Sequence, residues 1–369
     1  MKTGEFDDIR PYRDDEIPAH IELLLKDPSF IPKLCQFKIP RMYRICPPLI
    51  AAVIRTVIRR TAKRIRSQDD LHRIVAEYVK KIVDTSTLGF TYSGVENLPL
   101  NEPVLLISNH RDIALDSIFV NYALWLSDRP RTQIAVGENL FTQGFETEFM
   151  RINGSFIVKR SAESARKLYM AMNKTSRYIR QTLESGSSIW IAQREGRSKD
   201  GNDQTDPAIL KMFMLAYRKE LDALTEWLDT VNLVPVAITY ELDPCAPLKA
   251  RELSIREAMG HYTKADDEDF RSIARGLNGQ KGHVHVGFGH RIHGEFQDAE
   301  TLATEIDHQI SELLQPYPTF REAARLLQDR AMKLDLPQQL KDEFEKQLSE
   351  VAESEQRFLL QQYANQCKA

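Results

Sequence analysis

The sequence has few cysteines, and they are widely spaced. Its four cysteines stand alone within 369 residues, at Cys35, Cys46, Cys245 and Cys367. Zinc sites and disulfide frameworks use cysteines at short, regular spacings. We therefore expect four free thiols in a reducing compartment and no bound metal.

Long apolar stretches are also missing. A bilayer-spanning helix needs roughly 20 apolar residues, and the longest apolar run, Pro47 to Ile54, ends at Arg55. The first residues, MKTGEFDDIRPYRDDEIP, are acidic and lack the apolar core of a signal peptide. We expect a cytoplasmic protein whose contact with a membrane is peripheral, on the inner face.

Neither sign of charge is in marked excess. Lysine and arginine total 50 and aspartate and glutamate 53, for a formal net charge of -3. This balance gives no reason to expect a nucleic-acid partner. Apolar residues make up 42% and charged residues 28%, which is typical of a globular protein with a packed core.

The pattern of residues divides the chain into three predicted parts. Residues 1–84 are expected to form an N-terminal helical arm that ends in a periodic helix. Residues 85–295 alternate apolar strands with helices, which indicates an α/β layered domain. Residues 296–369 are charged and nearly free of glycine, and they are expected to form a C-terminal helical arm. Three prolines separate its helices: Pro316, Pro318 and Pro337.

The central part has a regular succession of predicted elements. Strands are predicted at FTYSG, PVLLIS, TQIAVG, SFIVK, IWIAQ, NLVPVAITY and HVHVGFG. Helices are predicted at about 113–126, 162–183 and 208–228, and a polar helical insert precedes the last strand. Pro235 lies inside NLVPVAITY, and proline within a strand favours an edge or a bulged position.

The segment ISNHRDIALD contains the first candidate for chemistry. An apolar strand ends at Asn109 and His110, and a helix that carries Asp116 follows. Active sites of α/β folds collect at the carboxyl ends of strands, and histidine can act there as a general base. Asp112 resembles an N-cap of the helix. By itself, the spacing is equally typical of a capped helix with an incidental histidine.

Three further segments have weaker individual signals. GSFIVKRS places Lys159 and Arg160 at a strand end, where cations suit an anionic group. In IAQREGRSKDG, Gly196 permits a sharp turn and Arg197 can reach a phosphate. Taken singly, these are also typical of solvated basic residues and of a plain strand-to-loop turn.

Together, in this order, the segments resemble the four blocks of the glycerolipid acyltransferase family over about residues 90–290. The first block matches at Asn109, His110 and Asp116, and the second in FIVKRS. The third matches in EGRS, and the fourth at Pro235 and Val236. The segment VENLP also resembles the lead-in to the family's first block. The resemblance implies an α/β fold with a mixed, mostly parallel sheet flanked by helices.

The resemblance also implies a reaction and its residues. His110 is the expected general base, oriented by Asp116, in direct transfer of an acyl group from acyl-CoA or acyl carrier protein to a hydroxyl of a glycerol phosphate or lysophosphatidic acid type acceptor. No metal or organic cofactor is implied. The expected substrate-binding residues are Lys159, Arg160, Glu195, Gly196, Arg197 and Ser198.

Two departures from the family pattern leave alternatives. Five residues separate His110 from Asp116 where the family has four, so Asp112 is the other candidate carboxylate. The third block is one residue shorter between Gly196 and Arg197. The alternatives in function are a degenerate member that binds lipid at the membrane without catalysis, or an acyltransferase for another lysolipid.

The segment PLIAAVIRTVIRRTAKRIR, residues 48–66, predicts how the protein meets lipid. Apolar residues alternate with six basic ones, and no acidic residue interrupts them. Helices of this composition lie at an anionic membrane surface. The other interpretation is that the apolar face packs on the catalytic domain and the basic face is solvated.

Overall fold

The computed structural model describes residues 4–140, 144–159, 163–221, 224–265, 267–329 and 331–367. The chain forms two compact units, Met1–Tyr78 with Arg131–Ile189, and Val79–Pro130 with Trp190–Ala369. Two of the three boundaries between the units fall inside helix α5 (Gln68–Ser86) and strand β5 (Ser188–Ala192), and the third lies between Pro130 and Arg131. The predicted limits of the domain and its arms, at 84/85 and 295/296, stay predictions.

The larger unit is built on a mixed sheet with the strand order β1-β7-β6-β2-β5. Pairing is parallel between β1 and β7 and between β2 and β6, and antiparallel between β6 and β7. The predicted α/β class with a mixed, mostly parallel sheet is therefore confirmed. The strands are β1 (Gly89–Ser93), β2 (Leu105–Ser108), β6 (Leu233–Tyr240) and β7 (His283–Phe288).

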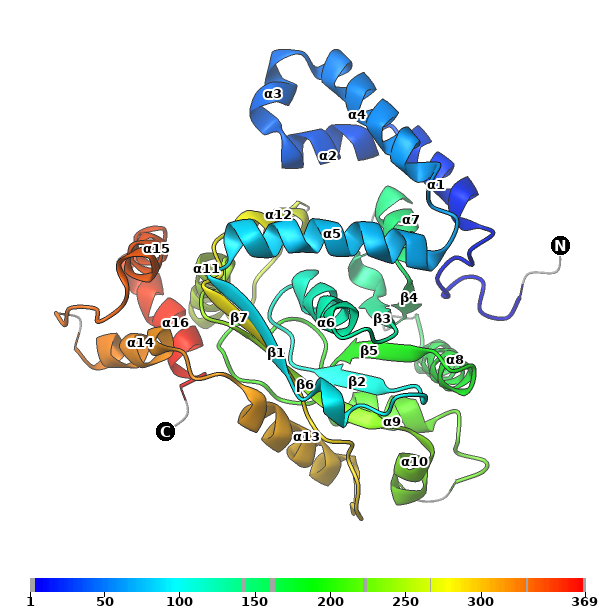
Figure 1. The fold of residues 1–369 in the computed structure, drawn as a ribbon. Coiled ribbons are helices and arrows are strands. Elements are labelled where there is room, and N and C mark those ends of the chain that lie inside the picture. Colours follow the sequence, from blue (N-terminus) through cyan, green and yellow to red (C-terminus); the bar gives the residue numbers. More distant parts are fainter. Residues whose placement is uncertain are drawn as a thin grey trace. The chain divides into compact units, whose positions relative to one another are not determined.

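Helices cover both faces of this sheet (Figure 1). Side chains alternate between faces along a strand, and Tyr240 and Phe90 on one face meet Phe119 of α6 (Leu115–Leu126). On the other face, a side chain at Gly287 would meet Leu313 of α13 (Ala299–Leu313). The remaining helices of this unit are α9 (Pro207–Met214), α10 (Leu224–Thr230), α11 (Ala246–Met259), α12 (Glu268–Asn278), α14 (Pro318–Gln328), α15 (Gln338–Ser349) and α16 (Glu353–Ala364).

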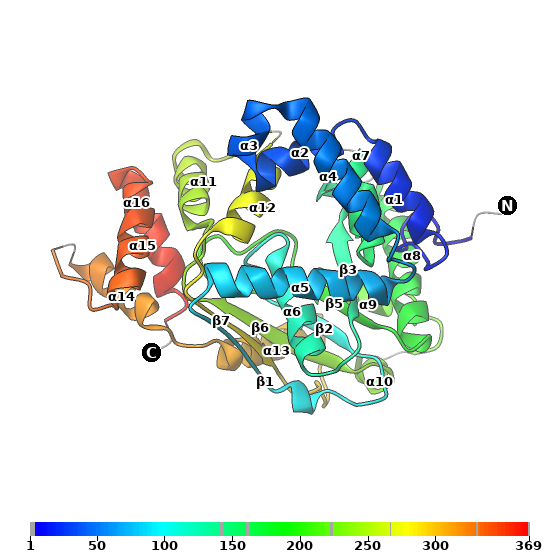
Figure 2. The ribbon, with the colours of Figure 1, turned by 45° about the horizontal axis from the view of Figure 1, so that its top comes forward.

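Helices α11 and α14 both pack against α16, and α15 lies close to α16 in both ribbon views (Figure 2). One buried apolar cluster contains Ala250 of α11, Phe320 of α14, Phe344 of α15 and Leu360 of α16. Pro318 begins α14 and Pro337 caps α15, as expected for residues that cannot continue a preceding helix.

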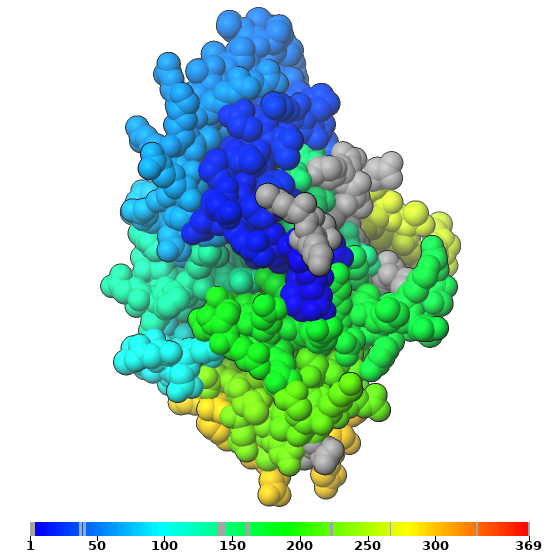
Figure 3. Space-filling view, turned by 90° about the vertical axis from the view of Figure 1, so that its right-hand side faces the viewer, coloured from blue at the N-terminus to red at the C-terminus, as the bar shows by residue number. Residues whose placement is uncertain are grey.

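The smaller unit combines a short parallel strand pair with a group of N-terminal helices. Strands β3 (Thr132–Gly137) and β4 (Ser155–Val158) pair in parallel, and β3 is next to β5 in the strand order. The outer surface of the N-terminal helices is blue in Figure 3. The helices of this unit are α1 (Ile17–Lys26), α2 (Phe30–Lys38), α3 (Pro40–Ile45), α4 (Pro47–Ala62), α7 (Gly144–Ile152) and α8 (Ala165–Glu184).

All seven predicted strands are present, but the helix predicted at 208–228 is wrong. The structure has two helices there, α9 and α10, with turns between them. The ring of Trp227 in α10 stacks on Phe213 in α9, with centroids 5.9 Å apart. The chain therefore folds back so that α10 packs on α9, a tertiary contact that local periodicity does not contain.

The edge position, one of the two predicted for Pro235, is also wrong, because β6 lies between β2 and β7. The carbonyl of Pro235 accepts a bond from the Gly289 amide, 2.8 Å away. In an antiparallel pair, the N–H and C=O of one residue point the same way. An N–H at residue 235 would therefore point toward β7, beyond Phe288, the last residue of β7 that pairs with β6 at this end. Proline at this position costs the pairing of β6 and β7 no hydrogen bond.

Candidate active site

The candidate site begins where β2 ends, at Asn109. Its side-chain amide takes the place of a backbone peptide beside β6: Oδ1 accepts from the Ile238 amide at 2.8 Å, and Nδ2 donates to the Ile238 carbonyl at 3.0 Å. Asn109 is fully buried. Because its side chain continues the pairing with β6, the backbone of the next residue, His110, is free to leave the sheet.

His110 meets a buried carboxylate at this point. Its Nδ1 lies 2.8 Å from Oδ2 of Asp116, which is in the first turn of α6. The Asp116 side chain is 1% exposed and that of His110 is 15% exposed. A carboxylate on Nδ1 fixes the imidazole tautomer, with the proton on Nδ1 and the lone pair on Nε2.

Three other donors hold the Asp116 carboxylate in place. Its Oδ2 also accepts from the backbone amides of Arg111 and Asp112, at 2.6 and 2.9 Å. Its Oδ1 accepts from the Tyr240 hydroxyl at 2.8 Å. Burial and the neighbouring Asp116 charge raise the pKa of Tyr240 well above its usual value, so the phenol stays protonated and donates.

The extra residue between His110 and Asp116 is taken up by a turn that precedes the helix. Oδ1 of Asp112 accepts from the amides of Ala114 and Leu115, at 2.9 and 2.8 Å. Asp112 therefore holds the start of α6, in the manner of a cap. Burial, then the Asp116 charge, raises the pKa of Asp112.

The third predicted block lies beside this turn. The Ser198 amide donates to the His110 carbonyl at 2.7 Å, and the Gln193 amide donates to the Ser108 carbonyl at 2.7 Å. The ends of β2 and β5 therefore meet at one edge. Gly196 has φ +73°, the left-handed conformation that glycine adopts readily. Glu195 is exposed in the same turn.

Within this block, Arg197 and Ser198, two of the residues with predicted substrate contacts, differ in their hydrogen bonding. The Ser198 hydroxyl donates to the Asn202 carbonyl at 2.7 Å and accepts from Arg111 at 3.2 Å. Arg197 is 8% exposed, and its Nη1 has no hydrogen-bond partner within the part of the chain that the structure describes. A buried guanidinium nitrogen without a partner is suited to an incoming anion.

The second predicted block belongs to the smaller unit. Nζ of Lys159 lies 2.8 Å from Oδ2 of Asp8, and both side chains are partly exposed. Arg160, the other predicted phosphate ligand there, lies outside the described residues. Their contact with a substrate stays a prediction.

Residue-by-residue reading of the sequence missed several groups of this site. Tyr240 ends the strand of the fourth block, so the alternation of side chains along β6 could have placed it on the face covered by α6. Trp190 of β5 packs edge-on against the His110 ring, with centroids 6.3 Å apart. Arg111 forms a buried ion pair with Asp203 at 2.6 Å, which no local motif signals.

Residues 89–239 match the family model described as Acyltransferase, in agreement with the family predicted from the four blocks, all of which lie within this span. No curated protein matches the sequence. Among solved structures, one match is the 1-acyl-sn-glycerophosphate (LPA) acyltransferase PlsC from Thermotoga maritima. It is 14% identical with a TM-score of 0.41, and the match covers 86% of this chain and 100% of that one. A likeness this distant does not transfer a substrate to this chain.

Proposed function

We propose that the protein moves a fatty acyl group in phospholipid synthesis, since residues 89–239 match the model of the acyltransferase family. The donor is acyl-CoA or acyl carrier protein, and the acceptor is a hydroxyl of glycerol phosphate or lysophosphatidic acid. His110 is the general base. The observation that carries the proposal is the 2.8 Å contact of His110 Nδ1 with the buried Asp116 carboxylate.

The proposed reaction is a direct transfer. Nε2 of His110 takes the proton of the acceptor hydroxyl as its oxygen attacks the thioester carbonyl. The tetrahedral intermediate then expels the thiolate, and the thiolate takes from the imidazolium the proton that came from the hydroxyl. Asp116 stabilises that imidazolium while it exists. The protein itself forms no covalent bond with the acyl group.

Cys245, whose thiol is affected by the charges of Asp112 and Arg197, is unsuited to be a nucleophile. Cys245 is fully buried, and burial, followed by the Asp243 charge, raises the pKa of its thiol to about 12. Since the thiolate is the reactive form, Cys245 stays a protonated thiol at neutral pH. This favours direct transfer to the acceptor over an acyl-cysteine intermediate.

The acceptor's phosphate is assigned to Arg197, supported by its buried Nη1 without a partner among the described residues. Arginine offers a planar fork to a phosphate, and orientation of the hydroxyl against a base can lower the barrier by roughly 7 kcal/mol or more. We also propose, as the second block predicts, that Lys159 and Arg160 bind phosphate, and that Glu195, Gly196 and Ser198 in the turn around Arg197 contact the substrate.

We further propose that the protein binds the inner face of the membrane through α4. No helix among the described residues has the length and apolar character to cross a bilayer. Leu49, Val53 and Val57 on α4 are 50 to 60% exposed. The same helix carries Arg55, Arg59 and Arg60, and this combination suits an anionic lipid surface.

The test is an acyl-transfer assay with purified protein. Labelled acyl-CoA, or acyl carrier protein in a parallel series, is offered with glycerol 3-phosphate, lysophosphatidic acid and a lysophospholipid with a larger head group. We expect an acylated product from a phosphate-bearing acceptor, and its loss in His110→Ala. His308→Ala, a change at an exposed histidine of α13, is the control. No product with any pair, or full activity in His110→Ala, would refute the proposal.

A further inference from the structure

Several backbone groups next to the proposed base are held by hydrogen bonds. The Asp116 carboxylate accepts hydrogen bonds from the amides of Arg111 and Asp112, and the Ser198 amide donates to the His110 carbonyl. The carbonyl of Arg111 accepts from Nζ of Lys249 at 2.8 Å. Lys249 therefore adds a side-chain contact to those that fix this turn.

Lys249 is a buried cation that lies outside the family domain. It belongs to α11, beyond residue 239 where the family match ends. Its side chain is 3% exposed, and Nζ also lies 2.6 Å from Oδ2 of Asp243. A buried ammonium needs a charged partner and further acceptors. Lys249 has both, and one of the acceptors is the turn that carries the base.

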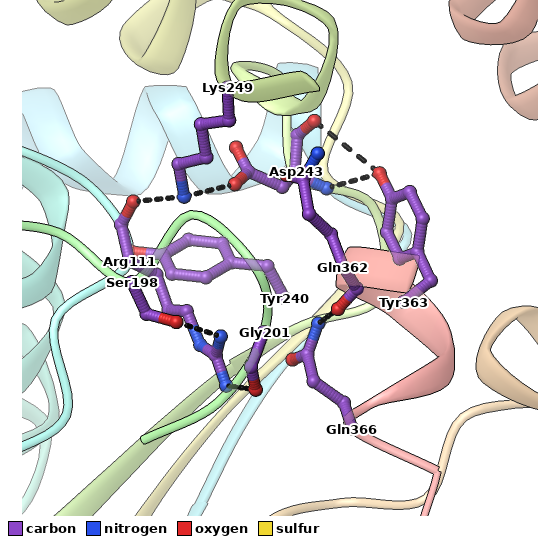
Figure 4. Close-up of a pocket in the computed structure, with 9 residues that line it drawn as sticks. All are labelled: Arg111, Ser198, Gly201, Tyr240, Asp243, Lys249, Gln362, Tyr363 and Gln366. Carbon is purple, nitrogen blue, oxygen red and sulfur yellow. Dashed lines mark hydrogen bonds and ion pairs between the residues drawn. The ribbon is translucent and has the colours of Figure 1, made fainter. Parts of the chain in front are cut away.

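Asp243 is held in turn by the C-terminal helices. Its amide donates to the Tyr363 hydroxyl at 2.9 Å, and its carbonyl accepts from Gln347 Nε2 at 3.1 Å. Tyr363 in α16 donates to Oε1 of Gln347 in α15 at 2.7 Å. Figure 4 shows Tyr363, Asp243, Lys249 and Arg111 in succession around one small polar cavity.

A second contact joins α16 to the turn of the third block. Nδ2 of Asn365 donates to the Asp200 carbonyl at 2.8 Å. Gly201 has φ +85°, and a Cβ there would lie 2.2 Å from the Gln362 carbonyl oxygen. Only glycine allows this approach. The loop that contains Arg197 and Ser198 is therefore fixed by the same helix that fixes Asp243.

We propose that Tyr363, Asp243 and Lys249 form a positioning relay, in which the C-terminal helices hold the turn that carries His110. The relay rests on the proposed role of His110 as base. The three residues touch no reacting atom in this scheme and act through the Arg111 carbonyl. Displacement of a catalytic group by about 1 Å can cost on the order of 100-fold in rate, so loss of the relay is expected to lower kcat without weakening substrate binding.

The test compares Lys249→Met and Tyr363→Phe with wild type in the full-length chain. We expect kcat to fall by roughly 10- to 100-fold in Lys249→Met and by less in Tyr363→Phe, with the KM values of both substrates within about 2-fold of wild type. The double variant should be no slower than Lys249→Met, because both changes break one path and their effects do not add. Lys249→Arg, which keeps the charge, should recover part of the rate.

Two matched controls separate the relay from general loss of stability. Lys281→Met removes another fully buried lysine, whose Nζ binds Ser86 and Gly279 instead. Tyr178→Phe removes a buried hydroxyl that binds Gln133 in the smaller unit. Wild-type kcat in Lys249→Met, an equal fall in Lys281→Met, or a rise confined to KM would overturn the relay.

A second measurement does not depend on activity. Hydrogen–deuterium exchange of peptides that cover Asn109–Asp116 should speed up in Lys249→Met and Tyr363→Phe and stay unchanged in both controls. If the wild type transfers no acyl group, the proposed function fails, and this exchange still decides whether the relay holds the turn. Unchanged exchange in Lys249→Met would refute the relay even in an active enzyme. Tyr363→Phe provides this readout if Lys249→Met does not fold.

Discussion

Asp116 and Asp112 differ in what they hold. Asp116 accepts from the His110 ring, two backbone amides and the Tyr240 hydroxyl, whereas Asp112 accepts from two amides at the start of α6. The first set orients a base and the second starts a helix. The two carboxylates should therefore respond differently to conversion into amides.

We expect Asp116→Asn to lower kcat by about 100-fold or more, because an amide cannot stabilise the imidazolium and its NH₂ would face donors. Asp112→Asn should change kcat by less than about 3-fold, since asparagine also caps helix starts. The measurement is kcat with the preferred acceptor, with thermal unfolding as a check on folding. The reverse ranking would assign the orienting carboxylate to Asp112.

Arg197 offers a second test at the level of single residues. We expect Arg197→Ala to raise the KM of the phosphorylated acceptor by about 10-fold or more, because it removes a charge-assisted contact, while the KM of the acyl donor changes little. Arg197→Lys should recover only part of the affinity, since an ammonium lacks the planar fork. Arg256→Ala on α11, where the arginine is half exposed, is the control. A rise in the donor KM instead would assign Arg197 to the thioester's phosphates.

At the level of elements, α4 has two apolar sides. Ile50, Ile54 and Ile58 pack against a buried cluster of the smaller unit, so part of the apolar face is internal. Leu49, Val53 and Val57 lie on the exposed side. The helix can therefore pack on the protein and bind a membrane at the same time, because different residues make the two contacts.

We expect the protein to cosediment with anionic vesicles, less so as salt rises, and to be released when Arg59, Arg60 and Arg64 are changed to Glu. Each basic residue near an anionic surface contributes about 1 kcal/mol. Val53→Asp with Val57→Asp should also weaken binding and leave the melting temperature unchanged. Lys341→Glu with Lys346→Glu on α15 is the control. If neither salt nor the change of Arg59, Arg60 and Arg64 to Glu weakened binding, the membrane contact would lie elsewhere.

The elements were predictable to the extent that their signals are local. Seven apolar runs gave seven strands, and His110 could be placed at a strand end from ISNHRDIALD alone. The break between α9 and α10 depends on Phe213 meeting Trp227, and the burial of Lys249 depends on Asp243 and on a carbonyl far back in the chain. Such contacts arise from tertiary packing, which neither periodicity nor motif spacing encodes.

For the molecule as a whole, Lys281 is an ionisable group whose pKa in the folded state makes stability depend on pH. It is fully buried, and desolvation lowers its pKa from 10.5 to about 8. The folded state therefore binds fewer protons than the unfolded state between those two values. The free energy of unfolding therefore rises with pH between these values. In this range Lys281 is still protonated in the unfolded state, whereas in the folded state it has already lost its proton.

We expect Lys281 to increase the free energy of unfolding by at most about 3 kcal/mol as the pH rises from about 8 to 10.5, as calculated from the fall in its pKa. The melting temperature should rise with it. Lys281→Met should remove this increase. Thermal unfolding across this pH range in both proteins is the measurement. Identical pH profiles would show that Lys281 keeps its ordinary pKa in the folded protein.

The amide of Asn109 has a consequence for how the sheet assembles. A one-residue slip of a strand turns every side chain to the opposite face, and β2, with only four residues, all fully buried, has no polar alternation to resist it. Asn109 matches only one alignment, because any slip would separate its amide from both polar groups of Ile238. Asn109, whose side chain lets His110 leave the sheet, therefore also fixes the register of β2 against β6.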